Sequence, residues 1–153
     1  MMRGALLAAL LLLVPQMAGA VSDEYRSLSA MLVGEADTAL TKGETDRARM
    51  LLDRALTADP SNARAFALKG HMTRRTGDPE EGVRLMTIGL DIDPTMTDVL
   101  VWQGLAAIDL DDFELAARAL AQIERLCGTD CAARQELSAA LTEARTARLD
   151  QGN

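Results

Sequence analysis

The feature that most constrains this sequence is a pair of chain-breaking residues that recurs at a fixed distance. Gly77 opens a segment that Pro94 closes, and Gly43 opens an upstream segment that Pro60 closes. Both the glycine and the proline therefore recur after 34 residues, from 43 to 77 and from 60 to 94. A fixed period of this length is typical of helical repeats, so the sequence predicts a helical repeat array.

The segment between Gly77 and Pro94 carries the signals of a helix start and a helix stop. Asp78 is expected to be the N-cap, and Pro79 suits the first helical position. Glu81 can reach back to close a capping box. The segment is therefore predicted to be one complete helix of a regular unit.

Apolar residues at helical spacing extend this pattern over the rest of the chain. Ser22 can cap a first helix. Because aromatic residues make up only 3% of the chain, the core must be aliphatic, which suits the packing of helix on helix. The predicted fold class is all-α, with helices over about 23–41, 45–59, 63–76, 79–93, 97–110, 113–127 and 131–149.

Small and large residues repeat at the same period. Small residues recur where helices must approach closely, and large residues recur where a ridge fills a groove. A succession of unrelated helices would not repeat these sizes three times. The repeating sets are Ala36, Gly70 and Gly104; Ala48, Gly82 and Ala116; and Leu52, Met86 and Leu120.

On these residues the chain resembles the tetratricopeptide repeat (TPR) family. The matching motif is a small residue in the first helix, Gly-Asp or Gly-Glu at the turn, Ala in the second helix and an Ala-Leu-x-x-Asp-Pro ending. The resemblance implies a helical-hairpin solenoid of three TPR-like units, over about 29–62, 63–96 and 97–130, with a C-terminal capping helix over about 131–149.

The third unit departs from the motif. Asp111 stands at the turn, Ile123 stands near the end of the second helix, and Gly128 stands where the proline would be. Terminal repeats of an array are commonly atypical because they must cap it, and the last helix fits that role.

Residues 1–20 are predicted to be a cleavable signal peptide. Arg3 precedes an unbroken apolar run over 5–14, and a small-x-small site ends at Ala20, so cleavage is expected between Ala20 and Val21. The apolar run is too short to span a bilayer comfortably, although an uncleaved membrane anchor is the alternative. Residues 21–153 then form the TPR-like domain.

Charge and composition limit the partners and suggest a compartment. Removal of residues 1–20 takes away one cation and no anion, so the net charge changes from −7 to −8. An acidic surface disfavours nucleic acids and anionic membranes as partners. Lys42 and Lys69 are the only lysines, and such a preference for arginine hints at a GC-rich bacterial genome. An export signal in such a cell predicts a periplasmic protein.

The only two cysteines, Cys127 and Cys131, lie four residues apart. In an exported protein a close, isolated pair usually forms a disulfide, which here would join the third unit to the last helix. A redox-active pair is the alternative, but thioredoxin-like chemistry requires a Cys-x-x-Cys motif in a βαβ setting. We therefore predict a structural disulfide.

The sequence offers little for catalysis or for a bound metal. His71, the only histidine, is followed by Met72, which suggests copper, but the other methionines of the mature chain are scattered and fit core filling better. No nucleophile with a nearby base and no phosphate-binding loop are evident. No enzyme activity, metal or cofactor is predicted.

The family resemblance implies a binding surface on the first helices of successive units, which line a concave groove. In this groove an apolar floor would lie beside a basic rim, a combination that suits a peptide with an apolar anchor and nearby carboxylates. The alternative is that the tryptophan belongs to the core and the arginines are solvated. The predicted peptide-binding residues are Arg64, Leu68, His71, Arg74, Arg75, Val101, Trp102 and Leu105.

The resulting hypothesis is a non-enzymatic periplasmic interaction module, an adaptor or assembly factor that binds a protein segment in the concave groove. The alternative is a periplasmic redox or copper-handling accessory protein that uses Cys127 and Cys131. Self-association through the solenoid ends is a third possibility.

Overall fold

The computed structural model describes residues 21–151, and the predicted signal peptide with its cleavage residue Ala20 lies outside this range. Over the described residues the chain forms helices and no strands, which confirms the predicted all-α class. The helices are α1 (Asp23–Thr41), α2 (Thr45–Ala58), α3 (Ala63–Arg75), α4 (Pro79–Ile92), α5 (Thr97–Asp109), α6 (Phe113–Cys127) and α7 (Ala132–Gln151).

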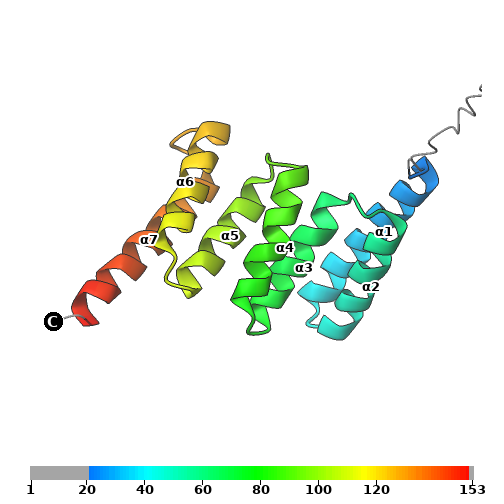
Figure 1. Ribbon diagram of the computed structural model, residues 1–153, viewed down its shortest axis with the longest axis horizontal. Helices are drawn as coiled ribbons and strands as arrows, with labels where there is room; N and C mark the ends of the chain where they lie inside the picture. Colours follow the sequence, from blue (N-terminus) through cyan, green and yellow to red (C-terminus); the bar gives the residue numbers. More distant parts are fainter. Residues whose placement is uncertain (1–20, 152–153) are drawn as a thin grey trace, which may run out of the picture.

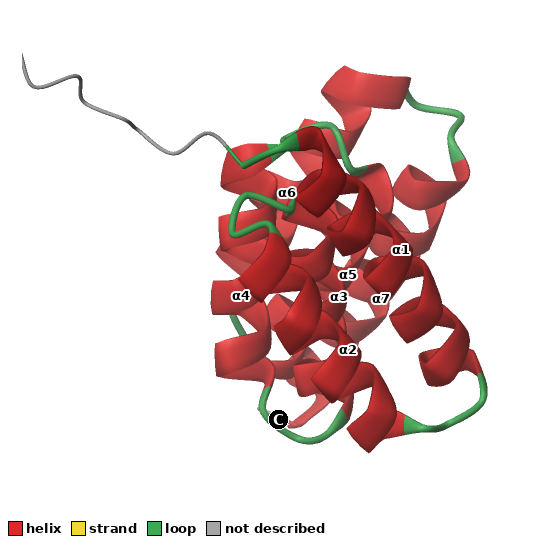
Figure 2. Ribbon diagram, turned by 90° about the vertical axis from the view of Figure 1, so that its right-hand side faces the viewer, coloured by secondary structure: helices red, strands yellow, loops and turns green. Residues whose placement is uncertain are grey.

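Neighbouring helices pair into antiparallel hairpins that stack side by side. The pairs α1–α2, α3–α4 and α5–α6 follow one another along the length of the molecule (Figure 1). Helix α3 also contacts both α1 and α5, so the first helices of the three hairpins form one layer. Figure 2 looks along the stack from the α1–α2 end. Helix α7 packs against α5 and α6 and closes the other end, as predicted for a capping helix.

Side-chain caps start α3, α4 and α6. The carboxylate of Asp78 accepts a hydrogen bond from the backbone N–H of Glu81 (3.0 Å), which confirms the predicted N-cap of α4. Asn62 caps α3 in the same way, with an N···O distance of 3.0 Å to Ala65. Two details of the prediction are wrong. Ser22 occupies the predicted N-cap position of α1 but makes no side-chain capping hydrogen bond, and Glu81 pairs with Arg84 instead of closing a capping box.

The turns within the three hairpins share one backbone conformation. Gly43 and Gly77 adopt positive φ angles of 74° and 100°, which glycine adopts without steric cost. The third turn places Asp111 at the matching position with φ of 59°. Aspartate is one of the few non-glycine residues that tolerates this conformation. The unusual turn predicted for the third unit therefore keeps the geometry of the other two.

The middle hairpin depends on glycines where its two helices meet. A Cβ atom added at Gly70 would lie 2.7 Å from the Gly82 carbonyl oxygen, and one added at Gly89 would lie 2.8 Å from the carbonyl oxygen of Ala63. Real Cβ atoms do not approach a backbone oxygen so closely. The backbones of α3 and α4 therefore touch at two levels, as the repeated small residues predicted.

The third hairpin is packed differently. A Cβ atom at Gly104 would lie 2.6 Å from the Leu137 methyl groups of α7. Leu137 and Ile123 are both fully buried, in the same core cluster as Leu100 and Val101. Helix α7 thus inserts a leucine beside α5 and completes the last core layer.

Candidate binding groove

The first helices of the three hairpins enclose a depression of about 170 Å³. Leu40 and Leu68, from α1 and α3, give it an apolar floor, and Trp102 of α5 closes one side. The remaining lining residues are Asp37 and Thr41 of α1 with His71 and Arg75 of α3. A second depression of about 130 Å³ shares Leu40, His71 and Arg75 with the first and reaches Gly43 of the α1–α2 turn.

Trp102 lies between two side chains of α3. The guanidinium carbon of Arg64 is 4.9 Å from the centre of the indole ring, and the imidazole of His71 is stacked at 4.3 Å with 29° between the ring planes. Arg64 and His71 are seven residues apart on α3, roughly 10 Å along the helix axis, so the indole fits between them. Both contacts are favourable ring interactions that hold Trp102 in place.

The predicted basic rim is largely neutralised within the protein. Arg64 forms an ion pair with Asp98 of α5. Arg74 binds Asp109 through two nitrogens, with N···O distances of 2.6 and 3.3 Å. These pairs link the middle and third hairpins. Arg75 is exposed and has no ion-pair partner within the described residues, so it is the arginine that stays available to a ligand.

The predicted apolar contacts lie deeper than expected. Val101 and Leu68 are 3% and 2% exposed, so Val101 belongs to the core and does not line the depression, and Leu68 contributes only to its floor. Leu105 is half-buried against the second core cluster. The structure thus gathers Leu68, His71, Arg75 and Trp102 at one depression and leaves Val101 in the core.

His71 has an unusual environment for a histidine at a surface depression. Its Nδ1 atom is buried and has no hydrogen-bond partner among the described residues. Burial, followed by the positive charges of Arg75, Arg74 and Arg64, lowers the pKa of His71 from 6.5 to about 4, and Asp98 opposes this change. At neutral pH the imidazole is therefore uncharged and carries one N–H donor.

The contribution of α1 to this site is absent from the predicted list of binding residues. Asp37 and Thr41 precede His71 and Arg75 by one repeat period of 34 residues. The period places them on the same face of the first helices, although only the structure shows that their side chains line the same depression.

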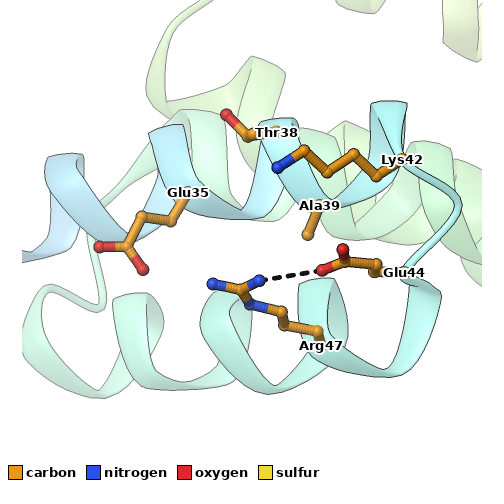
Figure 3. Close-up of a pocket in the computed structure, with 6 residues that line it drawn as sticks. All are labelled: Glu35, Thr38, Ala39, Lys42, Glu44 and Arg47. Atoms are coloured by element: carbon orange, nitrogen blue, oxygen red, sulfur yellow. Dashed lines mark hydrogen bonds and ion pairs between the residues drawn. The ribbon is translucent and has the colours of Figure 1, made fainter.

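A further depression lies away from the groove, where α1 and α2 face each other near their connecting turn (Figure 3). It measures about 110 Å³ and is lined mainly by charged groups, among them Glu35, Lys42 and Glu44. Arg47 pairs with Glu44 at 3.0 Å. Since these charges already balance one another and the floor offers only Ala39, this site is less suited to a ligand than the groove.

The structure also places the residues of the redox and copper alternative. The sulfur atoms of Cys127 and Cys131 lie 2.00 Å apart, and oxidation of this pair stays a prediction. Met72 is buried in the core, at 2% exposure. Within residues 21–151, no three His, Cys, Asp or Glu side chains converge closely enough to hold a metal ion. In the same range no helix is long and apolar enough to span a membrane.

Comparison with known proteins gives a match in fold alone. No family model and no curated protein matches the sequence. Among solved structures, the first TPR domain of Spaghetti (RPAP3) bound to an HSP90 peptide is 15% identical, with a TM-score of 0.71 over 81% of this chain and 95% of that one.

Two further structures agree with this match. The Sgt2 TPR domain from Aspergillus fumigatus is 20% identical, with a TM-score of 0.69 over 87% of this chain and 84% of that one. The Yersinia enterocolitica type III secretion chaperone SycD, in complex with a YopD peptide, is 14% identical, with a TM-score of 0.67 over 86% of this chain and 100% of that one. The chain therefore has the tetratricopeptide repeat fold.

Proposed function

We propose that this protein is a non-enzymatic interaction module of the periplasm, exported by its signal peptide, that binds a segment of a partner protein in the groove of α1, α3 and α5. The depression shared by these three helices is the observation that carries the proposal. It combines an apolar floor with Arg75, which has no ion-pair partner within residues 21–151, and small sites of this kind anchor individual side chains of a bound segment.

Similar solved structures support a protein segment as the ligand. The RPAP3 domain is bound to an HSP90 peptide, PcrH is in complex with the chaperone binding region of PopD, and SycD is bound to a peptide of YopD. These three domains share the fold of this chain at 14–16% identity. The adaptor role and the periplasmic location are part of the proposal and rest on the predicted signal peptide.

A matched pair of variants tests the proposal. Asp37→Trp places a bulky ring at the rim of the depression, whereas Asp91→Trp makes the same change at an exposed site on α4 that does not line it. Both variants should unfold at the same temperature as the wild type. Partners captured from periplasmic extract should be retained by Asp91→Trp and lost by Asp37→Trp. Equal capture by both variants would remove the groove from consideration.

A further inference from the structure

The groove depression is too small for a large ligand and has room for one side chain. Its volume of about 170 Å³ is well below the 300–1,000 Å³ that is typical of pockets for drug-sized molecules. Leu40, Leu68 and Trp102 form its apolar surface. A single apolar side chain of a bound segment would fill it.

Two hydrogen-bond donors stand beside this apolar surface. Arg75 is exposed and has no ion-pair partner in the described part of the chain, so its guanidinium can bind a carboxylate without breaking an existing pair. The Nδ1 atom of His71 is buried and has no hydrogen-bond partner within residues 21–151, which leaves Nε2 as the nitrogen that can meet a ligand. Because a buried N–H without an acceptor is costly, the proton of the neutral ring belongs on Nε2.

The surrounding charges limit how much negative charge the groove can accept. Asp37 lines the depression on the α1 side, and Asp98 and Asp109 already occupy Arg64 and Arg74. The whole chain carries a net charge of −7, which repels acidic segments at long range. One carboxylate next to Arg75 is therefore favoured, and a run of several carboxylates is not.

We propose that the depression binds an apolar side chain of the partner together with a single neighbouring carboxylate. Arg75 and Nε2–H of His71 donate hydrogen bonds to this carboxylate. This inference rests on the proposed function and adds the chemistry of the bound segment. The carboxylate would add negative charge beside His71, where the positive charges of Arg75, Arg74 and Arg64 outweigh the negative charge of Asp98. Binding is then linked to protonation of His71.

The test begins with a selection of phage-displayed random peptides on untagged full-length domain, residues 21–153. Selected peptides are synthesised with each Asp or Glu and with the matching Asn or Gln, and their affinities are measured for wild type, Arg75→Gln and Arg54→Gln. Arg54 is an exposed arginine of α2 outside the depression, and so serves as the control. We expect selected peptides to share one apolar residue beside one acidic residue.

Loss of either the peptide carboxylate or Arg75 should weaken binding by about tenfold, as expected for a charge-assisted hydrogen bond. In Arg75→Gln, removal of the carboxylate should weaken binding less than it does in the wild type, because the contact with Arg75 is already lost and only the contact with His71 remains. Arg54→Gln should bind like the wild type. If Asp37→Trp prevents peptide binding but replacing the acidic residue of the peptide leaves its affinity unchanged, this inference is overturned and the proposed function stands. If no selected peptide is blocked by Asp37→Trp, both fail.

A second readout uses the fact that His71 is the only histidine, so its imidazole Hε1 proton gives a single, readily assigned NMR signal. Titration of this signal should give a pKa that rises on addition of the acidic peptide and does not change with its amide counterpart. Peptide affinity should accordingly increase as the pH falls from 7 to 5.5, where peptide carboxylates stay ionised. His71→Gln should remove this pH dependence. An unchanged His71 signal in the saturated complex would contradict the proposed contact.

Discussion

The middle and third hairpins have small residues at matching positions, yet they use them for different contacts. In the middle hairpin the two helices touch backbone to backbone, because Gly70 faces Gly82 and Gly89 faces the carbonyl oxygen of Ala63. Neither contact leaves space for a side chain. The middle hairpin is therefore held together by its own glycines and depends on no other helix for this packing.

The third hairpin has a glycine at the position of Gly70 but an isoleucine at the position of Gly89. Gly104 receives the side chain of Leu137 from α7, and Ile123 fills the space that the middle hairpin closes by direct backbone contact. The comparison shows that the same motif position can admit either a neighbouring backbone or a side chain from the capping helix. The third hairpin therefore depends on α7, and the middle hairpin does not.

The largest expected effect comes from giving the middle hairpin the residue of the third. Gly89→Ile should lower the free energy of unfolding by about 3 kcal/mol or more, since its side chain would meet the backbone of α3. Urea unfolding followed by circular dichroism measures this. Gly34→Ala is the control, because a Cβ there meets no atom within 4 Å, and it should stabilise α1 by about 0.5–1 kcal/mol. A loss at Gly89 of less than about 1 kcal/mol would show that the close backbone contact is not essential.

The dependence of the third hairpin on α7 predicts a smaller effect on stability, and the sign of the effect of Gly104→Ala should depend on the residue at position 137. Leu137→Ala should cost about 2–3 kcal/mol through the cavity left beside α5. Gly104→Ala should destabilise the wild type, because its methyl group would meet Leu137, but stabilise Leu137→Ala by about 1 kcal/mol through helix propensity. The measurement is a double-mutant cycle in urea. If Gly104→Ala has the same sign in both backgrounds, Leu137 is not the group that Gly104 admits.

Sequence reasoning predicted the middle hairpin better than the third because local signals were sufficient there. Gly77, Asp78 and Pro94 mark the turn, cap and stop, and each acts on its own neighbours in the chain. The contact between Gly104 and Leu137 joins residues from different helices, which no local signal encodes. The period identified Gly104 as a small position, but it could not identify what would fill the space.

Sequence reasoning likewise predicted some features of the groove and missed others. The 34-residue period placed His71, Arg75 and Trp102 on one face, and the structure brings them to one depression. The ion pairs of Arg64 and Arg74 with the third hairpin were not predicted, because they depend on side-chain reach between helices. A pattern of residue types can place a charge on a face, but it cannot show whether that charge is already neutralised.

A third prediction concerns the link between α6 and α7. If Cys127 and Cys131 are oxidised, the protein made in an oxidising compartment should contain no reactive thiol, and the double variant Cys127→Ser, Cys131→Ser should lose roughly 2 kcal/mol. Hydrogen exchange should increase in α7 and leave α3 and α4 unchanged, since only the third hairpin depends on α7. Two reactive thiols in the native protein would contradict the structural disulfide.

The smallest expected effect separates the two hairpins by pH. His71 lies at the groove in the middle hairpin, and the matching position of the third hairpin is occupied by Leu105, which cannot titrate. Because burial and the neighbouring arginines lower the pKa of His71 from 6.5 to about 4, the folded state binds this proton less readily than the unfolded chain. The free energy of unfolding is therefore highest above pH 6.5, where the ring is neutral in both states, and it falls as the pH falls towards 4. Since His71 is only half-buried, solvent screening limits the loss to about 1 kcal/mol.

Urea unfolding across this pH range measures the effect. The free energy of unfolding should decline more steeply with falling pH for the wild type than for His71→Gln, which shares all other acid-sensitive groups. Equal slopes would mean that the protonated ring finds a compensating partner in the groove.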